Sequence, residues 1–469
     1  MLLSELLSAI DVREVHGSIE QIEVTSICYS SSDATSGSLF CCLVGARADG
    51  HDFAVEATYR GAVAVVCDHA VPVEVPQILV DRSQIRHVMA QLSAKLWGYP
   101  SKALRVVGVT GTNGKTTVCH MIKSILDANG CPSMTIGTLS GSRTTPEAPD
   151  LQRTLSMYSS NGGCGVAMEV SSHGLAQHRV DGTRFEVVCF TNLSRDHLDF
   201  HGSLENYYQA KASLFSPEFS DIGVVCVDDD WGRRLLEQAK IDMVPFSVQD
   251  VSDVNLQPSG ISFRWRGHAM RVPLVGMFNL SNAVAAASVA SVMGFATEGI
   301  AAGLAGMQPV PGRFEVVVNP PPFLGIVDYA HTPDGLRAAL ISARSMTGER
   351  GRVIVVFGCG GERDHGKRSM MGQVATTLAD VTVITSDNPR SEDPVSIARE
   401  ILAGAVSSAN VIVELDRREA IRSVAKLAGP NDVVLVAGKG HETTLELSSG
   451  SVPFVDSDEL AEAARNIES

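Results

Sequence analysis

The stretch at residues 108–117 constrains the fold of this chain more than any other. It reads Gly-Val-Thr-Gly-Thr-Asn-Gly-Lys-Thr-Thr and lies between an apolar run at 104–109 and a helical pattern at 118–126. A strand, a glycine-rich loop and a helix in this order can bind phosphate, because backbone N–H groups and the helix N-terminus then point at one anion. Gly108 stands six positions before Gly114, which departs from the strict P-loop spacing. We predict a nucleoside-triphosphate site, with an ordinary glycine-rich turn as the alternative.

The same ten residues resemble the ATP loop of the Mur ligases and of their relative folylpolyglutamate synthase. Both families join a carboxylate to an amine through an acyl phosphate. In this interpretation Lys115 reaches the outer phosphates and the Thr116 hydroxyl holds a magnesium ion. The resemblance implies ATP contacts at Gly111, Thr112, Asn113, Gly114, Lys115, Thr116, Thr117, Asn282 and Arg313. Taken alone, Asn282 near the start of an alanine-rich helix is an ordinary cap.

Composition limits the class of protein. The 469 residues favour two to four domains, and a net charge of -15 argues against nonspecific binding to nucleic acid or to an anionic membrane. Ten cysteines without Cys-x-x-Cys pairs predict reduced, mostly buried thiols. The N-terminus at 1–10 lacks the basic start of a secretory signal, and the apolar helix at 283–294 is too short to cross a bilayer. We expect a cytoplasmic protein without membrane insertion.

Residues 1–101 predict a small α/β domain, with a buried strand at 61–67 and an amphipathic helix at 85–96. The segments at 38–40 and 45–51 resemble the Mur ligase domain that holds the uridine of a UDP-sugar. Where the family has Asp-Ser-Arg, this chain has three serines, of which only Ser31 matches, and a serine-rich turn is the alternative. The resemblance implies contacts with a UDP-muramoyl dipeptide from Tyr29, Ser31, Ala46, Arg47, Ala48, Arg143, Thr144, Thr145, Ser171, Gln177 and Arg179.

Residues 102–311 predict a central domain with a mostly parallel sheet, from strand-like runs at 165–170, 186–190 and 223–227. Polar residues follow the first two runs, as expected at the carboxyl ends of such strands. Glu169 lies there and can share magnesium with Thr116.

His197 and His201 stand four residues apart, a spacing that also occurs in zinc sites. The glutamate of a His-Glu-x-x-His motif is missing and no third ligand is evident, so we disfavour zinc and expect His201 at the surface. The stretches at 168–179 and 191–202 resemble the Mur ligases that add the third residue of the muropeptide. That resemblance implies magnesium ligands at Glu169 and His197.

Lys211 lies in a helical segment at 207–215 and, taken alone, would be a solvated lysine. In the Mur ligases the lysine at this place is carbamylated by carbon dioxide and helps to hold a second magnesium ion. The resemblance therefore implies the metal-holding set Thr116, Glu169, His197 and Lys211, and the catalytic set Lys115, His197 and Lys211.

Residues 312–469 predict a Rossmann-like α/β domain, because the apolar runs at 324–327, 353–357, 381–385 and 433–436 each lead into glycines and charges. Gly358-x-Gly360 alone is a weak dinucleotide signal, and we disfavour NAD. Guanidinium groups suit a carboxylate and a glutamate suits an ammonium, so these loop ends predict an amino-acid pocket. The alternative is a set of surface charges on unrelated loops.

The motif at 387–390, Asp-Asn-Pro-Arg, resembles that of Mur ligases that add meso-diaminopimelate, whereas the lysine-adding relatives lack this arginine. The implied contacts are Arg363, Asp387, Asn388, Pro389, Arg390, Gly438 and Glu442. The resemblance as a whole implies a monomeric, magnesium- and ATP-dependent ligase of peptidoglycan precursor synthesis whose domains close during the reaction, with small-molecule substrates only. The alternatives are a lysine-adding ligase, a folylpolyglutamate synthase and a non-catalytic ATP-binding protein.

Overall fold

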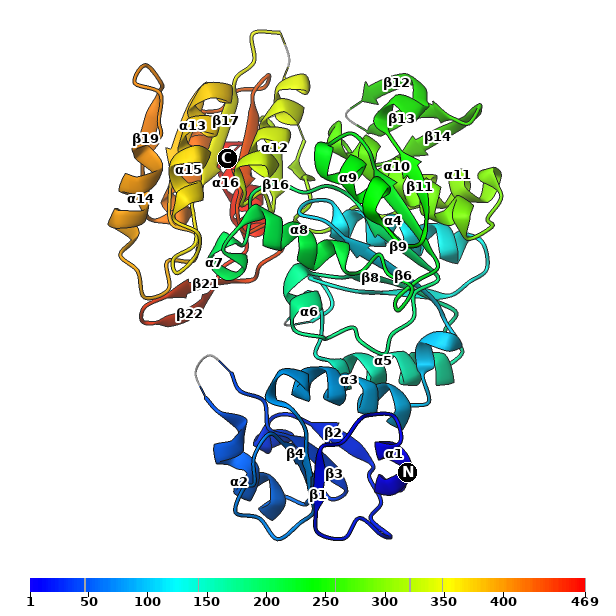
Figure 1. The fold of residues 1–469 in the computed structure, drawn as a ribbon. Coiled ribbons are helices and arrows are strands. Elements are labelled where there is room, and N and C mark those ends of the chain that lie inside the picture. The colour runs from blue at the N-terminus through cyan, green and yellow to red at the C-terminus, as the bar shows by residue number, and fades with distance from the viewer. Residues whose placement is uncertain (46–47, 142, 258, 320–321, 348, 469) are drawn as a thin grey trace.

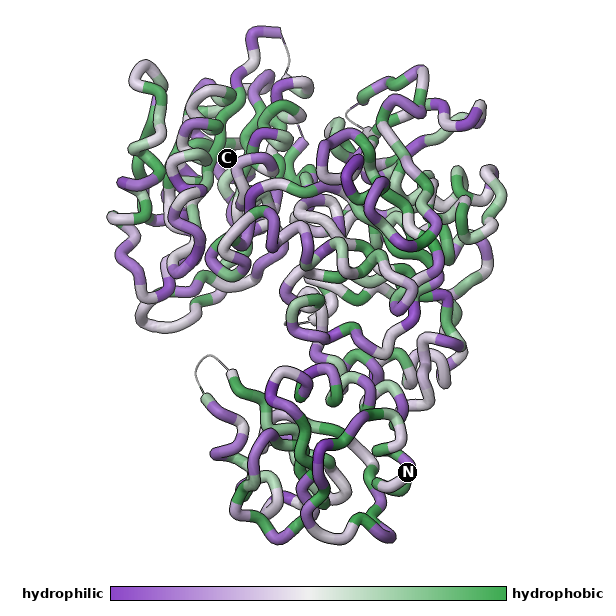
Figure 2. Tube along the Cα trace, viewed as in Figure 1, coloured by the Kyte–Doolittle hydropathy of each residue, from purple (hydrophilic) through white to green (hydrophobic). Residues whose placement is uncertain are grey.

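Each of the three predicted domains contains a sheet built largely from parallel strands (Figure 1). The computed structural model describes residues 1–45, 48–141, 143–257, 259–319, 322–347 and 349–468. Hydrophobic residues follow the strands inside each unit, and hydrophilic residues gather on the outer loops and helix faces (Figure 2). The α/β fold class predicted from the sequence is confirmed. The domain boundaries at 101/102 and 311/312 fall between the sheets and stay a proposal.

The N-terminal sheet has the strand order β1-β5-β4-β3-β2, with β1 antiparallel to β5 and the other pairs parallel. Its strands are β1 Glu14–His16, β2 Ser26–Cys28, β3 Ser38–Cys41, β4 Ala62–Cys67 and β5 Gln77–Leu79. The helical segments are α1 Leu3–Leu7, η1 Ser31–Asp33, η2 Gly50–Phe53, α2 Ala54–Tyr59, η3 Arg82–Gln84, α3 Ile85–Leu96 and η4 Pro100–Lys102. The predicted strand and helix of this region correspond to β4 and α3. Helix α3 packs against α5 of the next unit (Figure 1).

The central sheet is parallel throughout, in the order β11-β10-β9-β6-β8-β7. Its strands are β6 Arg105–Thr110, β7 Ser133–Ile136, β8 Gly165–Glu169, β9 Val187–Phe190, β10 Ile222–Cys226 and β11 Asp242–Phe246, and an antiparallel sheet follows with β12 Val251–Gln257, β13 Gly260–Trp265 and β14 His268–Val272. The helical segments are α4 Lys115–Ala128, α5 Ala148–Ser160, α6 Ser172–Ala176, α7 Leu198–His201, α8 Leu204–Ala212, α9 Asp230–Gln238, η5 Val248–Asp250, α10 Phe278–Val292 and α11 Thr297–Ala305.

The C-terminal sheet has the order β15-β16-β20-β17-β18-β19, with only the β15–β16 pair antiparallel among its described pairings. Its strands are β15 Glu315–Val318, β16 Leu324–Asp328, β17 Val353–Phe357, β18 Val381–Ile384, β19 Val411–Val413 and β20 Val433–Ala437, followed by a hairpin of β21 Thr444–Leu447 and β22 Gly450–Pro453. The helices are α12 Pro333–Ser345, α13 Gly366–Leu378, α14 Pro394–Leu402, α15 Arg417–Leu427 and α16 Asp456–Glu468.

Strand composition explains why the central strands are buried on both faces. β17 reads Val-Ile-Val-Val-Phe and β20 reads Val-Val-Leu-Val-Ala, and every residue of both is buried. Such continuous β-branched runs are typical of parallel strands covered by helices on both sides. The polar ends of these strands therefore meet at one edge of each sheet. No helix among the described residues has both the length and the apolar character that a membrane crossing requires.

The prediction that all cysteines are reduced is wrong for one pair. Cys131 and Cys164 form a disulfide, with their Cα atoms 5.2 Å apart, whereas the other eight cysteines are free and buried in the described structure. Each bonded cysteine lies just before a strand, and Ser133 of β7 pairs in register with Gly165 of β8. Parallel pairing thus brings together two cysteines that are 33 residues apart in sequence, at a separation that a disulfide requires.

Asp456→Ala is expected to destabilise the C-terminal domain by about 3–5 kcal/mol, because it leaves a buried guanidinium without its partner. Arg417 Nε and Asp456 Oδ1 are 2.7 Å apart, and both side chains are fully shielded from solvent. Urea unfolding followed by circular dichroism measures the change. Glu462 lies on α16, the helix that begins at Asp456, and is an exposed partner of Arg422 on α15. Glu462→Ala should lower the free energy of unfolding by less than about 1 kcal/mol. Equal effects of the two changes would contradict this account.

Candidate active site

The predicted ATP loop leaves the carboxyl end of β6, whose neighbours in the sheet are β8 and β9. After β6 the chain crosses to one side of it, and later returns to form β9 on the other side. Such a reversal leaves a crevice at the strand ends, where ligands bind in open α/β sheets. The loop, Glu169 and the segment after Phe190 all meet at this edge.

Glycine is required where the loop enters helix α4. Gly114 has φ +89°, and a Cβ there would collide with the side-chain oxygen of Asn282. Asn282 donates to Asn279 at 3.0 Å, and Asn279 donates to the carbonyl of Val275 at 2.8 Å. The helix α10 that carries these asparagines is therefore packed directly on the loop. The structure thus places Asn282 beside the predicted phosphate site.

Lys115 folds back over the loop that carries it. Its ammonium donates to the carbonyls of Gly111 at 3.0 Å and Thr112 at 2.8 Å. Burial lowers its pKa from the ordinary value. Because the lysine satisfies backbone carbonyls here, it can exchange them for phosphate oxygens without first leaving bulk water.

Thr116 is the meeting point of two predicted ligand residues. Its hydroxyl donates to Glu169 Oε1 at 2.9 Å and accepts from the guanidinium of Arg313 at 3.0 Å. Glu169 is buried and also accepts from the backbone N–H of Thr138 at 2.9 Å. Arg313 lies over the ring of Tyr329, 4.4 Å from its centroid. The C-terminal unit therefore contributes an arginine directly to the ATP loop.

Lys211 is buried, contrary to what its sequence context alone predicts. Its ammonium donates to the carbonyl of Gly111 at 2.7 Å and lies over the ring of Tyr207, 4.5 Å from the centroid. Burial, followed by the nearby charge of Lys115, holds the pKa of Lys211 well below its ordinary value. Burial therefore shifts this lysine toward its neutral form.

His197 adopts a left-handed conformation, with φ 52°, at the residue that precedes α7. Burial lowers its pKa to about 3, so the imidazole is neutral and can act as a metal ligand.

The prediction that His201 lies at the surface is wrong. It is buried, its Nε2 lies 2.9 Å from the hydroxyl of Ser172, and burial lowers its pKa to about 4. The short helix α7 turns this side chain inward.

Asp196 links the central unit to the C-terminal unit and was missed from the sequence. Its carboxylate lies 3.4 Å from His197, 3.6 Å from His331 and 3.8 Å from Lys367. Burial alone would raise the pKa of Asp196, but His331 and the surrounding positive charges hold it far below the ordinary value. Asp196 and His331 both lie in polar segments at strand ends, which is the signal that could have identified them.

A cavity of about 260 Å³ lies between the central and C-terminal units. Its lining includes most of the predicted diaminopimelate residues, namely Arg363, Asp387, Asn388, Arg390, Gly438 and Glu442, together with His197. Pro389 is buried in the same loop but is not part of the described lining. Residues from the ends of β17, β18 and β20 thus meet beside the predicted metal ligand of the central unit.

Arg390 lines this cavity, and its backbone has φ +56°. It donates to the carbonyl of Gly361 at 2.7 Å and lies 2.9 Å from the carboxylate of Glu446 in the β21–β22 hairpin. Arg363, by contrast, is exposed and makes no ion pair with any residue that the structure describes. The cavity therefore offers one anchored guanidinium and one free guanidinium to an incoming carboxylate.

Lys439 is a second residue that sequence reasoning missed. It is fully buried and donates to Asn388 at 3.0 Å, to Glu442 at 2.8 Å and to the carbonyl of Thr444 at 2.7 Å. Asn388 in turn donates to Glu442 at 2.7 Å. This network fixes the orientation of both predicted ligand residues. Lys439 lies in the polar segment that follows β20, and such strand-end segments were the signal used to predict the other site residues.

Buried Glu147 forms ion pairs with three arginines that come from two units. It lies 3.0 Å from Arg86 of α3, 3.4 Å from Arg143 and 3.0 Å from Arg179. Arg179 also donates to Gln177 at 2.6 Å and to the carbonyl of Thr145 at 3.0 Å. These contacts hold the predicted substrate residues of the central unit against the N-terminal unit.

Other predicted contacts of the UDP-muramoyl substrate are placed as follows. Thr145 donates to Ser171 at 3.0 Å, and Thr144 lies 3.1 Å from the hydroxyl of Thr138. Tyr29 donates to Asp150 at 2.9 Å and accepts from Arg143 at 3.5 Å. Ser31 instead donates to Glu56 at 2.9 Å, so its hydroxyl is engaged within the N-terminal unit. Ala48 is described as exposed, whereas Ala46 and Arg47 lie outside the described residues.

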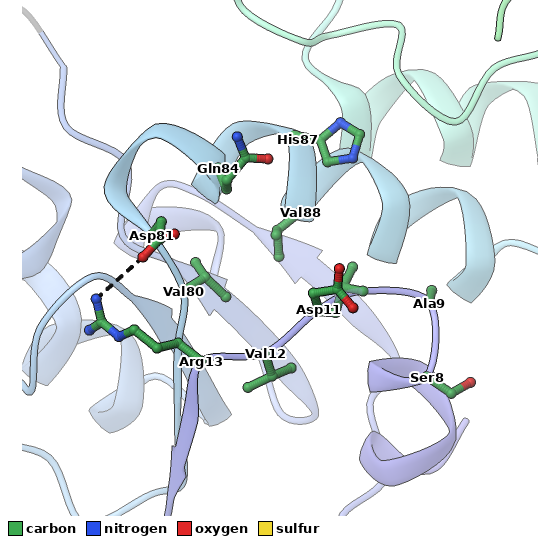
Figure 3. Close-up of a pocket in the computed structure, with 11 residues that line it drawn as sticks. Ser8, Ala9, Asp11, Val12, Arg13, Val80, Asp81, Gln84, His87 and Val88 are labelled. Atoms are coloured by element: carbon green, nitrogen blue, oxygen red, sulfur yellow. Dashed lines mark ion pairs between the residues drawn. The ribbon is translucent and has the colours of Figure 1, made fainter.

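A larger hollow, of about 750 Å³, lies on the N-terminal unit between the segment Ser8–Arg13 and the start of α3 (Figure 3). Arg13 and Asp81 form an ion pair of 3.6 Å across one end of it. Its described lining contains no predicted site residue. The candidate active site is therefore the ATP loop together with the smaller cavity, which contains His197.

Comparison with known proteins agrees with this arrangement. Residues 109–290 match the Mur ligase middle domain, residues 312–440 the Mur ligase glutamate ligase domain, and residues 23–96 the Mur ligase family catalytic domain. The UDP-N-acetylmuramoyl-L-alanyl-D-glutamate–2,6-diaminopimelate ligase of Solibacter usitatus (strain Ellin6076) is 40% identical over 97% of each chain. The enzyme of that name from Geobacillus kaustophilus (strain HTA426) is 42% identical over 92% of this chain and 93% of the other.

Solved structures of related enzymes resemble this chain along most of its length. One of a UDP-N-acetylmuramoyl-L-alanyl-D-glutamate–2,6-diaminopimelate ligase has a TM-score of 0.67 at 30% identity, covering 99% of both chains. Folylpolyglutamate synthase of Mycobacterium tuberculosis, complexed with ADP and AMPPCP, has a TM-score of 0.63 at 17% identity. That match covers 82% of this chain and 95% of the other and shows the shared fold alone. On the family matches and the full-length relatives together, the chain belongs to the Mur ligase family of ATP-dependent amide ligases.

Proposed function

We propose that this chain joins meso-2,6-diaminopimelate to the D-glutamate of UDP-N-acetylmuramoyl-L-alanyl-D-glutamate, with ATP as cosubstrate, in cytoplasmic peptidoglycan precursor synthesis. The observation that carries the proposal is the cavity where Arg363, Arg390 and Glu442 face His197 across two units. An amino acid with two amino-carboxyl centres matches two guanidinium groups and several carboxylates. We further propose that the chain acts as a monomer and that its substrates are these small molecules alone.

The reaction proceeds in two steps. The D-glutamate side-chain carboxylate attacks the γ-phosphorus of ATP, which releases ADP and leaves an acyl phosphate. The neutral amine of diaminopimelate then attacks the acyl carbon, so that an amide and inorganic phosphate form and the amine loses a proton. Lys115 and the loop N–H groups stabilise charge on the transferring phosphoryl group. No covalent bond to the protein is required.

The oxygen donors at the loop fit magnesium. Thr116 and Glu169 are already in contact at 2.9 Å, and hydroxyl and carboxylate oxygens are the ligands this ion prefers. Thr116 and Glu169 would hold one ion, and His197 with modified Lys211 would help to hold a second. Bound magnesium neutralises phosphate charge. The protein itself contributes the fixed orientation of these donors.

Modification of Lys211 follows from its burial. A neutral amine attacks carbon dioxide and loses a proton, which gives a carbamate anion, whereas an ammonium cannot react. Burial and the charge of Lys115 favour the neutral amine. The carbamate would place a negative charge beside Lys115 and the metal-holding residues.

The C-terminal unit must bring the diaminopimelate amine to the acyl phosphate. Arg195 and Asp364 join the central and C-terminal units at 3.3 Å, and Asp196 contacts His331 and Lys367 in the same region. Asp196, His331, Asp364 and Lys367 of these pairs line the cavity. The pairs support closure of one unit on the other, as expected for lids that exclude water.

A phosphate-release assay tests the proposed function. With ATP, magnesium, UDP-N-acetylmuramoyl-L-alanyl-D-glutamate and meso-diaminopimelate present, we expect stoichiometric phosphate and amide product. Omission of either non-nucleotide substrate should remove both. Product formed with lysine in place of diaminopimelate would identify a lysine-adding ligase, and product formed with a folate substrate would identify a folylpolyglutamate synthase. Binding of ATP without any product would identify a non-catalytic protein.

Arg390→Ala is expected to raise the KM for diaminopimelate by about 30-fold or more, because a desolvated carboxylate loses a partner worth about 2–5 kcal/mol. The KM for ATP should change far less. Arg390→Lys should also fail, since one ammonium cannot reproduce two parallel hydrogen bonds. Arg399→Ala, on the exposed face of α14, serves as the control. Unchanged diaminopimelate kinetics in Arg390→Ala would exclude this contact.

A further inference from the structure

A histidine–aspartate cluster in the N-terminal unit contains none of the residues assigned above to ATP, metal or substrate. It consists of His51 in η2, Asp68 after β4 and its neighbour His69, whose ligand atoms all lie within 4.8 Å of one another. His51 and Asp68 are largely buried, with side-chain exposures of 5% and 11%, whereas His69 is 63% exposed. The cluster is thus anchored on its inner side and open to solvent on the outer side.

The tautomer of His51 is fixed by its surroundings. Its Nδ1 lies 2.6 Å from Asp49 Oδ1, so this nitrogen carries the proton and donates to the carboxylate. Its Nε2 holds the ring's single lone pair, which accepts a long hydrogen bond of 3.3 Å from the backbone N–H of Asp68, and a metal ion would take that lone pair in exchange for this bond. A carboxylate that orients a histidine through its other nitrogen is the usual support of a metal-binding imidazole.

Two acceptors then face each other without a proton between them. His51 Nε2 and Asp68 Oδ1 are 3.3 Å apart, and the second oxygen of Asp68 is shielded from solvent with no hydrogen-bond partner among the described residues. Arg82 is the nearby cation, 3.8 Å from that oxygen. A cation between the two acceptors would satisfy this arrangement.

The spacing fits a tetrahedral ion. Two ligands about 2.0–2.1 Å from a zinc ion at a tetrahedral angle are themselves about 3.3 Å apart, which is the separation of His51 Nε2 and Asp68 Oδ1. His69 Nδ1 already contacts Asp68 Oδ1, and its ring stacks on that of His51 at 4.3 Å. Because His69 is exposed, its ring can turn to supply a third ligand, and water can take a fourth position.

We propose that His51, Asp68 and His69 bind a zinc ion, with Asp49 orienting His51. Two imidazoles and one carboxylate suit zinc and its cobalt or nickel substitutes rather than magnesium, which prefers oxygen ligands alone. The ion would tie η2 to the end of β4, and η2 follows the loop that contains Ala48. It would stabilise the N-terminal unit from outside the ATP site.

The test uses the full chain, stripped with a chelator and free of nucleotide and magnesium. Equilibrium dialysis against zinc should give one equivalent that His69→Ala binds at least 100-fold more weakly, and Asp49→Asn about 10–100-fold more weakly. Cobalt should give a visible absorption band that His69→Ala loses. Zinc should raise the thermal midpoint of the wild type and leave that of His69→Ala unchanged.

Two controls make the result decisive. His16→Ala removes a partly exposed histidine of the same unit, paired with Glu14 at 2.8 Å, and this variant should still bind one equivalent of zinc. His87→Ala disrupts a second described cluster, formed with His178 and Asp181, and this variant should also keep the bound zinc. His69 is exposed, so its substitution preserves the fold, which circular dichroism checks. Equal zinc binding by wild type and His69→Ala, or loss of the bound zinc in His87→Ala, would overturn the proposal.

Discussion

Alanine in place of Lys115 is expected to reduce phosphate release at least about 1000-fold, the upper range for loss of one group that stabilises transition-state charge. The lysine already lies on the loop carbonyls of Gly111 and Thr112, so it is positioned before ATP arrives. Its ammonium meets charge that grows on the transferring phosphoryl group. The assay is phosphate release with all three substrates at saturation.

The matched control for this change is Lys123→Ala on the same helix. Lys123 is partly exposed and pairs with Asp127, so its loss should leave turnover near that of the wild type. Circular dichroism checks that both variants are folded. Near-normal turnover in Lys115→Ala would exclude the ATP-loop assignment.

Lys211→Ala is expected to reduce turnover by about 100- to 1000-fold. Its amine is buried against Gly111 and Tyr207, where an unmodified ammonium would be poorly solvated and where the carbamate would supply a metal-holding anion. The loss should appear in kcat more than in the KM for ATP, because the loop itself stays intact. Steady-state kinetics with varied ATP separate these two effects.

Carbon-13 labelling distinguishes a carbamate from a purely structural lysine. Wild-type protein equilibrated with labelled carbon dioxide should show a carbamate resonance by NMR that Lys211→Ala lacks. Formate or acetate should restore part of the activity of Lys211→Ala, since either acid can occupy the space of the carbamate. An active wild type without the resonance would contradict the assignment.

Local sequence signals predicted much of the fold. The glycine pattern, the valine-rich strands and the helix after Lys115 all depend on neighbouring residues, and each has its counterpart in β6, β17, β20 and α4. Contacts between distant segments could not be predicted in this way. The Cys131–Cys164 disulfide depends on the register of β7 against β8, which no spacing in the sequence reveals.

The same limit applied to the candidate site. Arg390, Asn388 and Glu442 were found because they lie in polar strand-end segments, and the structure brings them to one cavity. Their organising partners were missed: Lys439 is buried beneath two of them, and Asp196 acts across two units. Buried charges of this kind are recognised by their partners in space. His201 was misjudged for the same reason, since side chains of other elements, Ser172, His173 and Tyr207, surround it.

The choice between meso-diaminopimelate and L-lysine tests the central claim most directly. The wild-type protein receives ATP, magnesium and UDP-N-acetylmuramoyl-L-alanyl-D-glutamate, with each amino acid in turn, and amide product is quantified by mass spectrometry. Lysine lacks the second carboxylate, so it would lose the charge-assisted hydrogen bonds that Arg390 offers in the cavity. We predict a kcat/KM for meso-diaminopimelate at least about 100-fold above that for lysine. Equal use of the two amino acids, or product with lysine alone, would contradict the account.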